Sequence, residues 1–294
     1  MKIISHLNPR HMDDFLAIAI LKTKYTDAEI DFVHPQSVPD TFIKDPEIIL
    51  VDVGGNYNPQ LKNYDHHQDL NLPSSIVLVL SNEFEGVLNL TKILSSQTIN
   101  FIDTTDRFGV KQASELAGVP LNSQEDKMRK EILLIDLKKH ALEVGEIALK
   151  TLNIQKYSEW LSEFYKKLDE LGLLDEPRKI IKKEEESFYD KLSKSRAIKI
   201  KNLNVLISTE SLAPFHNKAF ELGTDIIIEK NSMNPQHTSI IKNTNSPKTK
   251  HLDLSKVFNL YPKVFIHQNG FIAVIGVSIN DVEPAKIIEL LTIE

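Results

Sequence analysis

The sequence predicts an α/β protein with a largely parallel N-terminal sheet flanked by helices, a helical connector and a smaller C-terminal α+β domain. Strand-like runs alternate with a helical run near the N-terminus, amphipathic patterns fill the middle, and strand-like runs return toward the C-terminus. A chain of 294 residues also exceeds the usual size of a single core. We expect domains over 1–122 and 197–294, joined by a connector over 123–196.

The N-terminal part has β-α-β order. Apolar runs at 2–7, 28–35 and 47–55 end in polar or turn residues, as strands do. Residues 13–25, DDFLAIAILKTKY, are apolar on nearly every side, which is typical of a helix buried against a sheet. This alternation favours parallel pairing, with a ligand crevice beyond the carboxyl ends of the strands. Residues 74–84, SSIVLVLSNEF, are ambiguous, because β-branched content favours a strand and the Ser-rich start favours a helix cap.

The middle of the chain alternates charged and apolar residues at helical spacing. This pattern predicts three amphipathic helices, at 124–152, 157–174 and 176–195. Their apolar stripes also suggest a homodimer formed through this region. Beyond them, five strands and a closing helix are predicted at 197–209, 224–230, 237–243, 263–269, 271–278 and 282–292.

The composition limits the kinds of protein that this chain can be. No apolar run approaches the roughly 18 residues of a membrane span, and the start does not resemble a signal peptide, so we expect a cytoplasmic protein. The absence of cysteine excludes disulfides, thiolate nucleophiles and cysteine-based zinc sites. A net charge of −6 argues against an overall basic coat for nucleic acid, while a local basic groove remains compatible with it.

Acidic and imidazole side chains occur where predicted strands end or helices begin. In a parallel sheet such ends meet along one edge, so residues far apart in the sequence can converge there. The stretch NYDHHQD at 63–69 is the densest example, with one carboxylate and two imidazoles in series. The candidates are His6, His11, Asp13, Asp14, Asp52, Asp65, His66, His67, Asp103 and Asp106.

A mixed set of histidine and aspartate without cysteine fits Mn²⁺ better than structural zinc, with Mg²⁺ as the alternative. The set exceeds the needs of one cation, which favours two ions about 3.5–4 Å apart that share a carboxylate. Such a pair generates hydroxide near neutral pH and promotes displacement at phosphorus. Taken singly, each residue has a plainer interpretation, such as a helix cap, a turn or a loop histidine. The set indicates metal chemistry because several separate element ends carry the same kind of ligand.

These residues resemble the DHH phosphoesterase superfamily. The pattern VDVGG followed by YDHHQ, and preceded by H....H.DD, is similar to its Myg (melanocyte proliferating gene) branch, described as metal-dependent hydrolases and 3′–5′ RNA exonucleases. The segment KVFIHQNGFIAVIG at 263–276 is similar to the C-terminal F.H..GF motif of that branch. The resemblance spans most of the chain and is weakest in the helical middle.

The resemblance implies a metal-binding catalytic domain over 1–122 and a substrate-binding domain over 197–294. Asp52 would bridge the two ions. Asp103 and Asp106, three residues apart and on one face of a helix, compete for the last ligand position. The implied metal ligands are His6, His11, Asp13, Asp52, His66 and one of Asp103 and Asp106.

Other residues would act on the substrate. By resemblance, His67 contacts the scissile phosphate and Asp65 orients the imidazoles. The chain has LNPR where the branch has Gly and an aromatic residue, and here Arg10 either binds phosphate or points to solvent. His267 and Gly270 would hold the terminal phosphate or ribose of a nucleotide. HQNGFI is equally a two-residue hairpin signal, and both interpretations can hold.

Together these expectations describe a metal-dependent phosphodiesterase that uses a two-metal-activated hydroxide. The resemblance implies that it is a 3′–5′ exonuclease on single-stranded RNA or a short oligonucleotide. The polar loop at 242–251, with Lys248 and Lys250, would follow the phosphates. One alternative is hydrolysis of small phosphate compounds, such as dinucleotides or pyrophosphate, by the same centre. The other is a non-catalytic, metal-stabilised nucleic-acid-binding protein.

Overall fold

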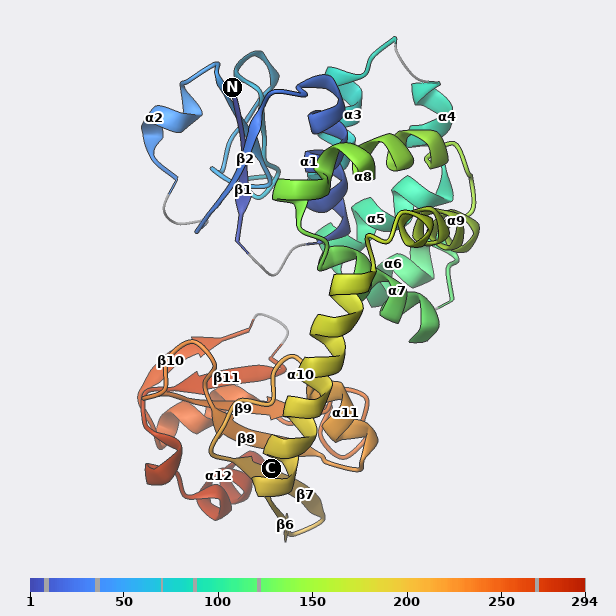
Figure 1. Ribbon diagram of the computed structural model, residues 1–294. Helices are drawn as coiled ribbons and strands as arrows, with labels where there is room; N and C mark the ends of the chain where they lie inside the picture. Colours follow the sequence, from blue (N-terminus) through green and yellow to red (C-terminus); the bar gives the residue numbers. More distant parts are fainter. Residues whose placement is uncertain are drawn as a thin grey trace. The chain divides into compact units, whose positions relative to one another are not determined.

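We describe the protein from a computed structural model, which covers residues 1–7, 11–34, 38–69, 71–86, 89–120, 123–267 and 270–293. The chain divides into two compact units, Met1–Ile180 and Ile181–Glu294, and each is described by itself. The first contains a mostly parallel sheet flanked by helices, and the second, which is the smaller unit, contains a mixed sheet (Figure 1). The predicted α/β class is confirmed.

The first sheet has the strand order β2-β1-β3-β5-β4. Its pairs are parallel except for the short hairpin of β4 and β5. All four residues of β3 are buried, as expected of a strand covered on both faces. The strands are β1 (Lys2–His6), β2 (Glu29–Val33), β3 (Ile48–Val51), β4 (Tyr57–Asn58) and β5 (Asn63–Tyr64).

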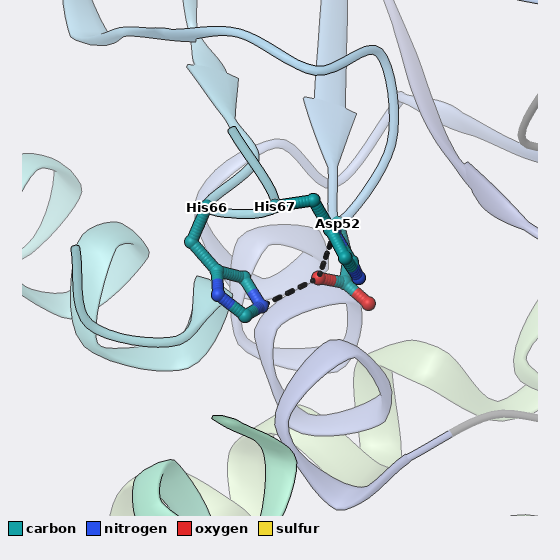
Figure 2. Close-up of side chains that lie close together, drawn as sticks. All are labelled: Asp52, His66 and His67. Atoms are coloured by element: carbon teal, nitrogen blue, oxygen red, sulfur yellow. Dashed lines mark ion pairs between the residues drawn. The ribbon is translucent and has the colours of Figure 1, made fainter. Parts of the chain in front are cut away.

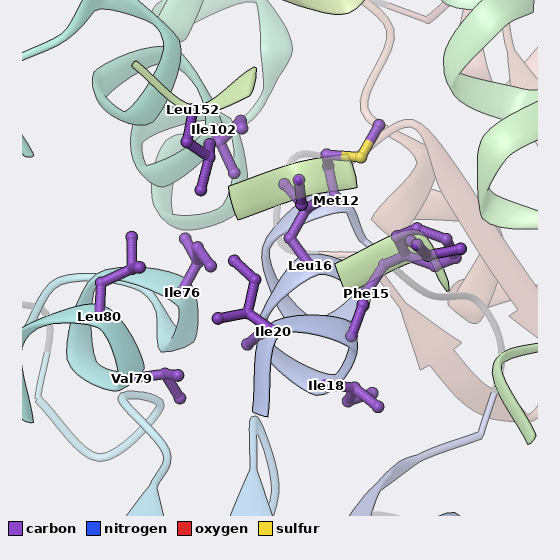
Figure 3. Close-up of a cluster of buried hydrophobic side chains, with 14 of the residues drawn as sticks. Met12, Phe15, Leu16, Ile18, Ile20, Ile76, Val79, Leu80, Ile102 and Leu152 are labelled. Carbon is purple, nitrogen blue, oxygen red and sulfur yellow. The ribbon is translucent and has the colours of Figure 1, made fainter. Parts of the chain in front are cut away.

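Helix α1 (Met12–Lys24) is the central helix of this unit, and its residues from Met12 to Leu21 are all buried. Leu16 and Ile20 lie toward Ile76 of the neighbouring helix α3 (Ser75–Glu83) (Figure 3). On another side, α8 (Leu137–Thr151) approaches so closely that a Cβ at Gly145 would lie 2.0 Å from the Ala19 carbonyl oxygen. The all-round apolar pattern of 13–25 is therefore explained by neighbours on several sides.

The ambiguous segment 74–84 is helical, because it forms α3. Ser74 stands at the position before the first helical residue, although its side chain makes no capping hydrogen bond, and the β-branched residues are accommodated by burial rather than by pairing with a strand. The unit also contains α2 (Asp40–Ile43), η2 (Pro59–Leu61), α4 (Leu90–Leu94), α5 (Gln97–Phe108), α6 (Val110–Ala117), α7 (Ser123–Leu133) and α9 (Tyr157–Glu170).

The middle region differs from the prediction of three helices. The first predicted helix, 124–152, is two helices, α7 and α8, because Asp136 caps α8 and its Oδ1 accepts from the Lys138 amide at 3.1 Å. The structure also divides the chain after Ile180, whereas the predicted connector covers 123–196. The apolar stripes of α8 and α9 are buried in the core of the first unit, including Val144, Trp160 and Phe164.

The second unit contains a sheet of order β10-β11-β9-β8-β7-β6, antiparallel except between β7 and β8. Alternate residues of β8 serve two cores: Ile226 and Ile228 face one, and Ile227 faces the other. Helix α10 (Asp175–Lys194) contributes Phe188 to the second of these cores. The remaining elements are β6 (Arg196–Ile200), β7 (Leu203–Ser208), α11 (His216–Glu221), β8 (Ile226–Lys230), β9 (Thr238–Lys242), η3 (Leu254–Asn259), β10 (Lys263–Ile266), β11 (Ile272–Ile275), η4 (Ile279–Asp281) and α12 (Pro284–Leu291).

Across the described part of the chain, no helix combines the length and the apolar character that crossing a lipid bilayer requires.

Candidate metal centre

Three neighbouring parallel strands end at the candidate site. His6 is the last residue of β1, Asp52 follows β3 directly, and β5 leads into Asp65, His66 and His67. Because β1, β3 and β5 are adjacent in the sheet, their carboxyl ends lie on one edge. The start of α1 and the last turns of α5 complete the site, through the residues described below.

The structure brings two ligand sets together. Asp52, His66 and His67 form one set (Figure 2), and in each set the ligand atoms lie within 4.8 Å of one another. His66 Nε2 lies 2.8 Å from Asp106 Oδ2 and 3.2 Å from Asp52 Oδ1. Ligands at about 2.0–2.2 Å from a cation lie roughly 3 Å from one another, so this spacing suits a shared ion. The second set is Asp13, Asp52, His66 and Asp106.

Asp52 occupies the middle of the site. Its backbone has a φ of 57°, the left-handed region that aspartate tolerates better than most residues. Its Oδ2 lies 3.2 Å from His6 Nε2, while its Oδ1 faces His66. Burial alone would raise the pKa of Asp52, but His6 and His66 together hold it below its ordinary value. The two carboxylate oxygens thus face different histidines, as a bridging ligand requires.

Asp13 is fully buried, and neither of its carboxylate oxygens has a hydrogen-bond partner. Burial, and then repulsion from Asp52 and Asp106, raises the pKa of Asp13 well above its ordinary value. His66 Nε2 and Asp106 Oδ2 also lack partners with hydrogen-bond geometry, despite their close approach. Buried polar atoms normally find partners, and a cation would supply one to all three groups. The residues present therefore fit a metal ion.

Histidine side chains surround the carboxylates. His6 Nδ1 donates to the Leu7 carbonyl oxygen at 2.7 Å, which leaves Nε2 facing Asp52. Bonding to Asp52 raises the pKa of His6 to about 9. Despite its burial, His66 has a pKa raised to about 10 by Asp106 and Asp52. In the absence of a cation the imidazoles therefore hold protons that balance the buried negative charge.

His11 lies at the rim of the site, with about half of its side chain exposed, and its Nδ1 is 2.9 Å from Asp106 Oδ1. Bonding to Asp106 raises the pKa of His11. Asp106 therefore faces His11 with one oxygen and His66 with the other.

His67 is held by Asp65. Its Nδ1 donates to Asp65 Oδ1 at 2.7 Å, and its backbone amide donates to the same oxygen at 3.1 Å. The other oxygen of Asp65 accepts from the Gly55 amide at 2.6 Å. Asp65 is buried, whereas 62% of the His67 side chain is exposed. The expected orienting contact between these two residues is present, and the ring of His67 is accessible to a ligand.

The two aspartates that compete for the last ligand position have different partners. Asp106 faces the two histidines of the site, as described above. Asp103 lies one turn earlier in α5, where its Oδ1 accepts from the Ser74 amide at 2.6 Å and its Oδ2 from Arg107 Nη2 at 2.7 Å. Asp103 caps the start of α3 and does not belong to either ligand set in the described residues.

Two residues at the site were not among the predicted ligands or substrate contacts. Asp14 is fully buried beside His6, and the DD pair after His11 was its only signal in the sequence. Ser75 Oγ lies 3.1 Å from Asp52 Oδ1 and 2.8 Å from the Tyr64 carbonyl oxygen. The serine pair at 74–75 predicted a cap, and nothing in the sequence connected it to Asp52.

The remaining predicted residues are elsewhere. Arg10 lies outside the described residues. His267, Gly270, Lys248 and Lys250 belong to the second unit. The His267 ring lies 4.3 Å from that of Phe271, measured between centroids, and Gly270 has a φ of 61° at the turn after β10. Lys248 Nζ lies 3.2 Å from Asp225 Oδ2, so a buried carboxylate already neutralises part of its charge.

Comparison with known proteins finds relatives of the N-terminal part. The family model described as "Uncharacterised protein family (UPF0160)", with the short name MYG1_exonuc, matches residues 2–72. The protein named "MYG1 exonuclease" of Homo sapiens is 34% identical over 134 residues, which cover 43% of this chain and 30% of that protein. Its namesake from Mus musculus is 32% identical over 134 residues, with 43% and 29% covered. The match thus spans about a third of the length of these relatives.

Among solved structures, an uncharacterized protein from Helicobacter pylori G27 is 11% identical, with 96% of this chain and 94% of that chain covered and a TM-score of 0.31. Of the residues at the site, the family model leaves out Ser75, Asp103 and Asp106 and covers the others. The sequence comparisons therefore support the likeness to the MYG1 family in the segment that carries most of the site. Placement in the wider DHH superfamily stays a prediction.

Proposed function

We propose that this protein is a metal-dependent phosphodiesterase, and specifically a 3′–5′ exonuclease on single-stranded RNA. The observation that carries the proposal is that ligand atoms of four residues lie within 4.8 Å of one another, those of Asp13, Asp52, His66 and Asp106. Both carboxylate oxygens of Asp13 are also buried without a hydrogen-bond partner. The relatives named exonucleases support it, although the match covers about 30% of their length. The RNA preference and the polarity come from the motif resemblance.

The donor set of carboxylates and imidazoles suits Mn²⁺, with Mg²⁺ as the alternative. Asp13, His66 and Asp106 would hold one ion and His6 the other, and Asp52, which faces both His6 and His66, would contribute to both. His11 would contribute to the metal centre through its contact with the Asp106 carboxylate. When bound, such a pair of cations supplies a nucleophile from water near neutral pH and neutralises charge on phosphoryl oxygens.

The protein's own groups complete the chemistry. Because His67 Nδ1 donates to Asp65, its Nε2 is the ring atom left to contact a substrate. Bonding to Asp65 raises the pKa of His67, which favours the protonated ring as a donor to a phosphoryl oxygen. Asp65 is fixed in turn by the Gly55 amide, so the imidazole is oriented before substrate arrives. Ser75 orients the carboxylate of Asp52 in the same way.

Residues of the second unit are proposed as further substrate contacts. His267 and Phe271 present neighbouring rings on which a base could stack, beside the left-handed turn at Gly270. Lys248 and Lys250 remain the proposed phosphate contacts of the polar loop. Of these, Lys248 would have to exchange its contact with Asp225 for a phosphate.

A second candidate is hydrolysis of small phosphate compounds, such as dinucleotides or pyrophosphate, by the same centre. The pairing of Lys248 with Asp225 favours it, because it weakens the basic segment that would follow a polymer. The net charge of −6 points the same way. For this candidate, the turnover rate should depend little on salt concentration.

The test is cleavage of end-labelled RNA and DNA oligonucleotides and of pyrophosphate, side by side, with Mn²⁺, Mg²⁺ or chelator. The proteins compared are the wild type and the variants His67→Ala and Lys166→Ala. Lys166 lies on the exposed face of α9, and its variant serves as the control. Stepwise shortening of RNA from its 3′ end, lost with chelator and in His67→Ala but kept in the control, is the expected result. Turnover of pyrophosphate alone would favour the small-compound hydrolase over the RNA exonuclease. No turnover of any substrate would favour a non-catalytic binding role.

A further inference from the structure

Asp14 lies beside the proposed metal ligands and has had no role so far. It is the third residue of α1 and is fully buried. Its Oδ1 accepts from the backbone amide of His11 at 2.7 Å, and its Oδ2 lies 3.5 Å from His6 Nε2. One side chain thus touches both histidines that precede the helix.

The Oδ2 atom of Asp14 is buried without a hydrogen-bond partner. The contact with the His11 amide at the start of the helix therefore accounts for only one of the two carboxylate oxygens. Its aim at His6 Nε2 makes it part of the electrostatic environment of the site. The ligand sets in the described residues do not include it, although both include Asp52. Its position is therefore that of a group acting through the histidines rather than of a ligand.

We propose that Asp14 is a positioning residue of the metal centre. Its Oδ1 fixes the backbone at His11, and its Oδ2 places a carboxylate oxygen 3.5 Å from His6 Nε2, the ring atom that also faces Asp52. The Leu7 carbonyl oxygen constrains the opposite ring nitrogen and so sets the orientation of the ring beside Asp14. Residues that orient ligands in this way typically contribute 10–100-fold to metal affinity. The inference rests on the proposed function only in requiring that the site binds a divalent cation.

The test is titration of the full chain with Mn²⁺ by calorimetry, with circular dichroism to confirm folding. Asp14→Ala removes both contacts. Asp14→Asn keeps an oxygen for the His11 amide and loses the charge facing His6. Asp136→Ala removes the cap of α8 and serves as the control for a general effect of losing a helix-start carboxylate.

The expected result is Mn²⁺ affinity lowered about 10–100-fold in Asp14→Ala and by a smaller factor in Asp14→Asn, with the number of bound ions unchanged. Asp136→Ala should bind Mn²⁺ as the wild type does. Wild-type affinity in a folded Asp14 variant would overturn the positioning role, and a lost ion would make Asp14 a ligand instead. If the wild type itself binds no Mn²⁺, the proposed function fails, and that outcome is separate from a failure confined to the Asp14 variants.

Discussion

Glu83 and Asp13 are both carboxylates buried in the first unit, and their surroundings differ completely. Glu83, at the end of α3, accepts from Lys24 Nζ at 2.6 Å and from the Tyr25 hydroxyl at 2.8 Å, and also from the Tyr64 hydroxyl. Neither oxygen of Asp13 accepts a hydrogen bond. A buried acid with a complete set of donors holds the fold together. A buried acid without donors needs a ligand that the chain itself does not supply.

The pKa values of the two groups move in opposite directions because their neighbours differ. Burial raises both, but at Glu83 the contacts with Lys24, Tyr64 and Tyr25 outweigh it and lower the pKa. At Asp13 the neighbouring carboxylates add repulsion, and the pKa rises. Glu83 is therefore stabilised as an anion by the protein, whereas Asp13 becomes a stable anion only beside a cation.

The largest expected effect comes from Asp13→Asn. Loss of one ligand charge should lower Mn²⁺-dependent phosphodiester hydrolysis by at least about 100-fold, because bound cations supply several kcal/mol of charge stabilisation. In chelator, the unfolding temperature should not fall, because without a cation the site favours a neutral group at this position and the amide is neutral. Hydrolysis assays and calorimetric unfolding of both proteins check this. Wild-type turnover, or clear destabilisation in chelator, would contradict the role given to Asp13.

Asp106→Asn and Asp103→Asn sharpen the same contrast within a single helix. Asp106→Asn should lower Mn²⁺ affinity by more than about tenfold, since it alters a group proposed to bind the ion. Asp103→Asn keeps an acceptor for the Ser74 amide but loses the Arg107 pair. It should cost about 1–2 kcal/mol of unfolding free energy and leave Mn²⁺ affinity unchanged. Mn²⁺ titration by calorimetry and denaturant unfolding of both variants test this. If Asp103→Asn lost Mn²⁺ affinity and Asp106→Asn lost only stability, the roles of the two residues would be reversed.

Glu83→Gln tests the other side of the comparison. It replaces one acceptor oxygen by a donor, which then faces either Lys24 and Tyr25 or Tyr64, and should cost about 2–3 kcal/mol of unfolding free energy. Mn²⁺ affinity should stay unchanged. Glu143→Gln, at an exposed position of α8, is the matched control and should change stability by less than about 0.5 kcal/mol. An Mn²⁺ defect in Glu83→Gln would mean that the two carboxylates are coupled.

The contrast also explains what sequence reasoning could and could not reach. Strand ends were predictable, because apolar runs stop at His6 and before Asp52, and a parallel sheet places such ends together. Asp103 and Asp106 were not separable, because both lie on one helix face and only the partners, Ser74 and Arg107 for Asp103, distinguish them. The Ser74 contact joins residues that are distant in the chain, and no local spacing encodes it, whereas the Arg107 pair has the i,i+4 spacing of a helical ion pair.

The break between α7 and α8 was missed for a different reason. The apolar pattern runs through it without interruption, and the only local signal is Asp136, one acid among many in that region. A cap residue is informative only when the start of a helix is already suspected. The number of helices was therefore wrong although their amphipathic character was correctly predicted.

The smallest expected effect is a pair of opposite pH dependences in metal-free protein. The pKa of Glu83 is lowered in the folded state, so its stabilisation is present above the ordinary value of 4.5 and is lost as pH falls through the folded value. The stability difference between wild type and Glu83→Gln should therefore shrink below about pH 4.5.

The pKa of Asp13 is raised, so the folded state binds its proton more tightly, and wild type should lose stability relative to Asp13→Asn as pH rises above 3.8. Denaturant unfolding in chelator from pH 3.5 to 7 measures both slopes. Slopes of the same sign would show that partner contacts do not distinguish the structural carboxylate, Glu83, from Asp13, the carboxylate proposed to bind metal.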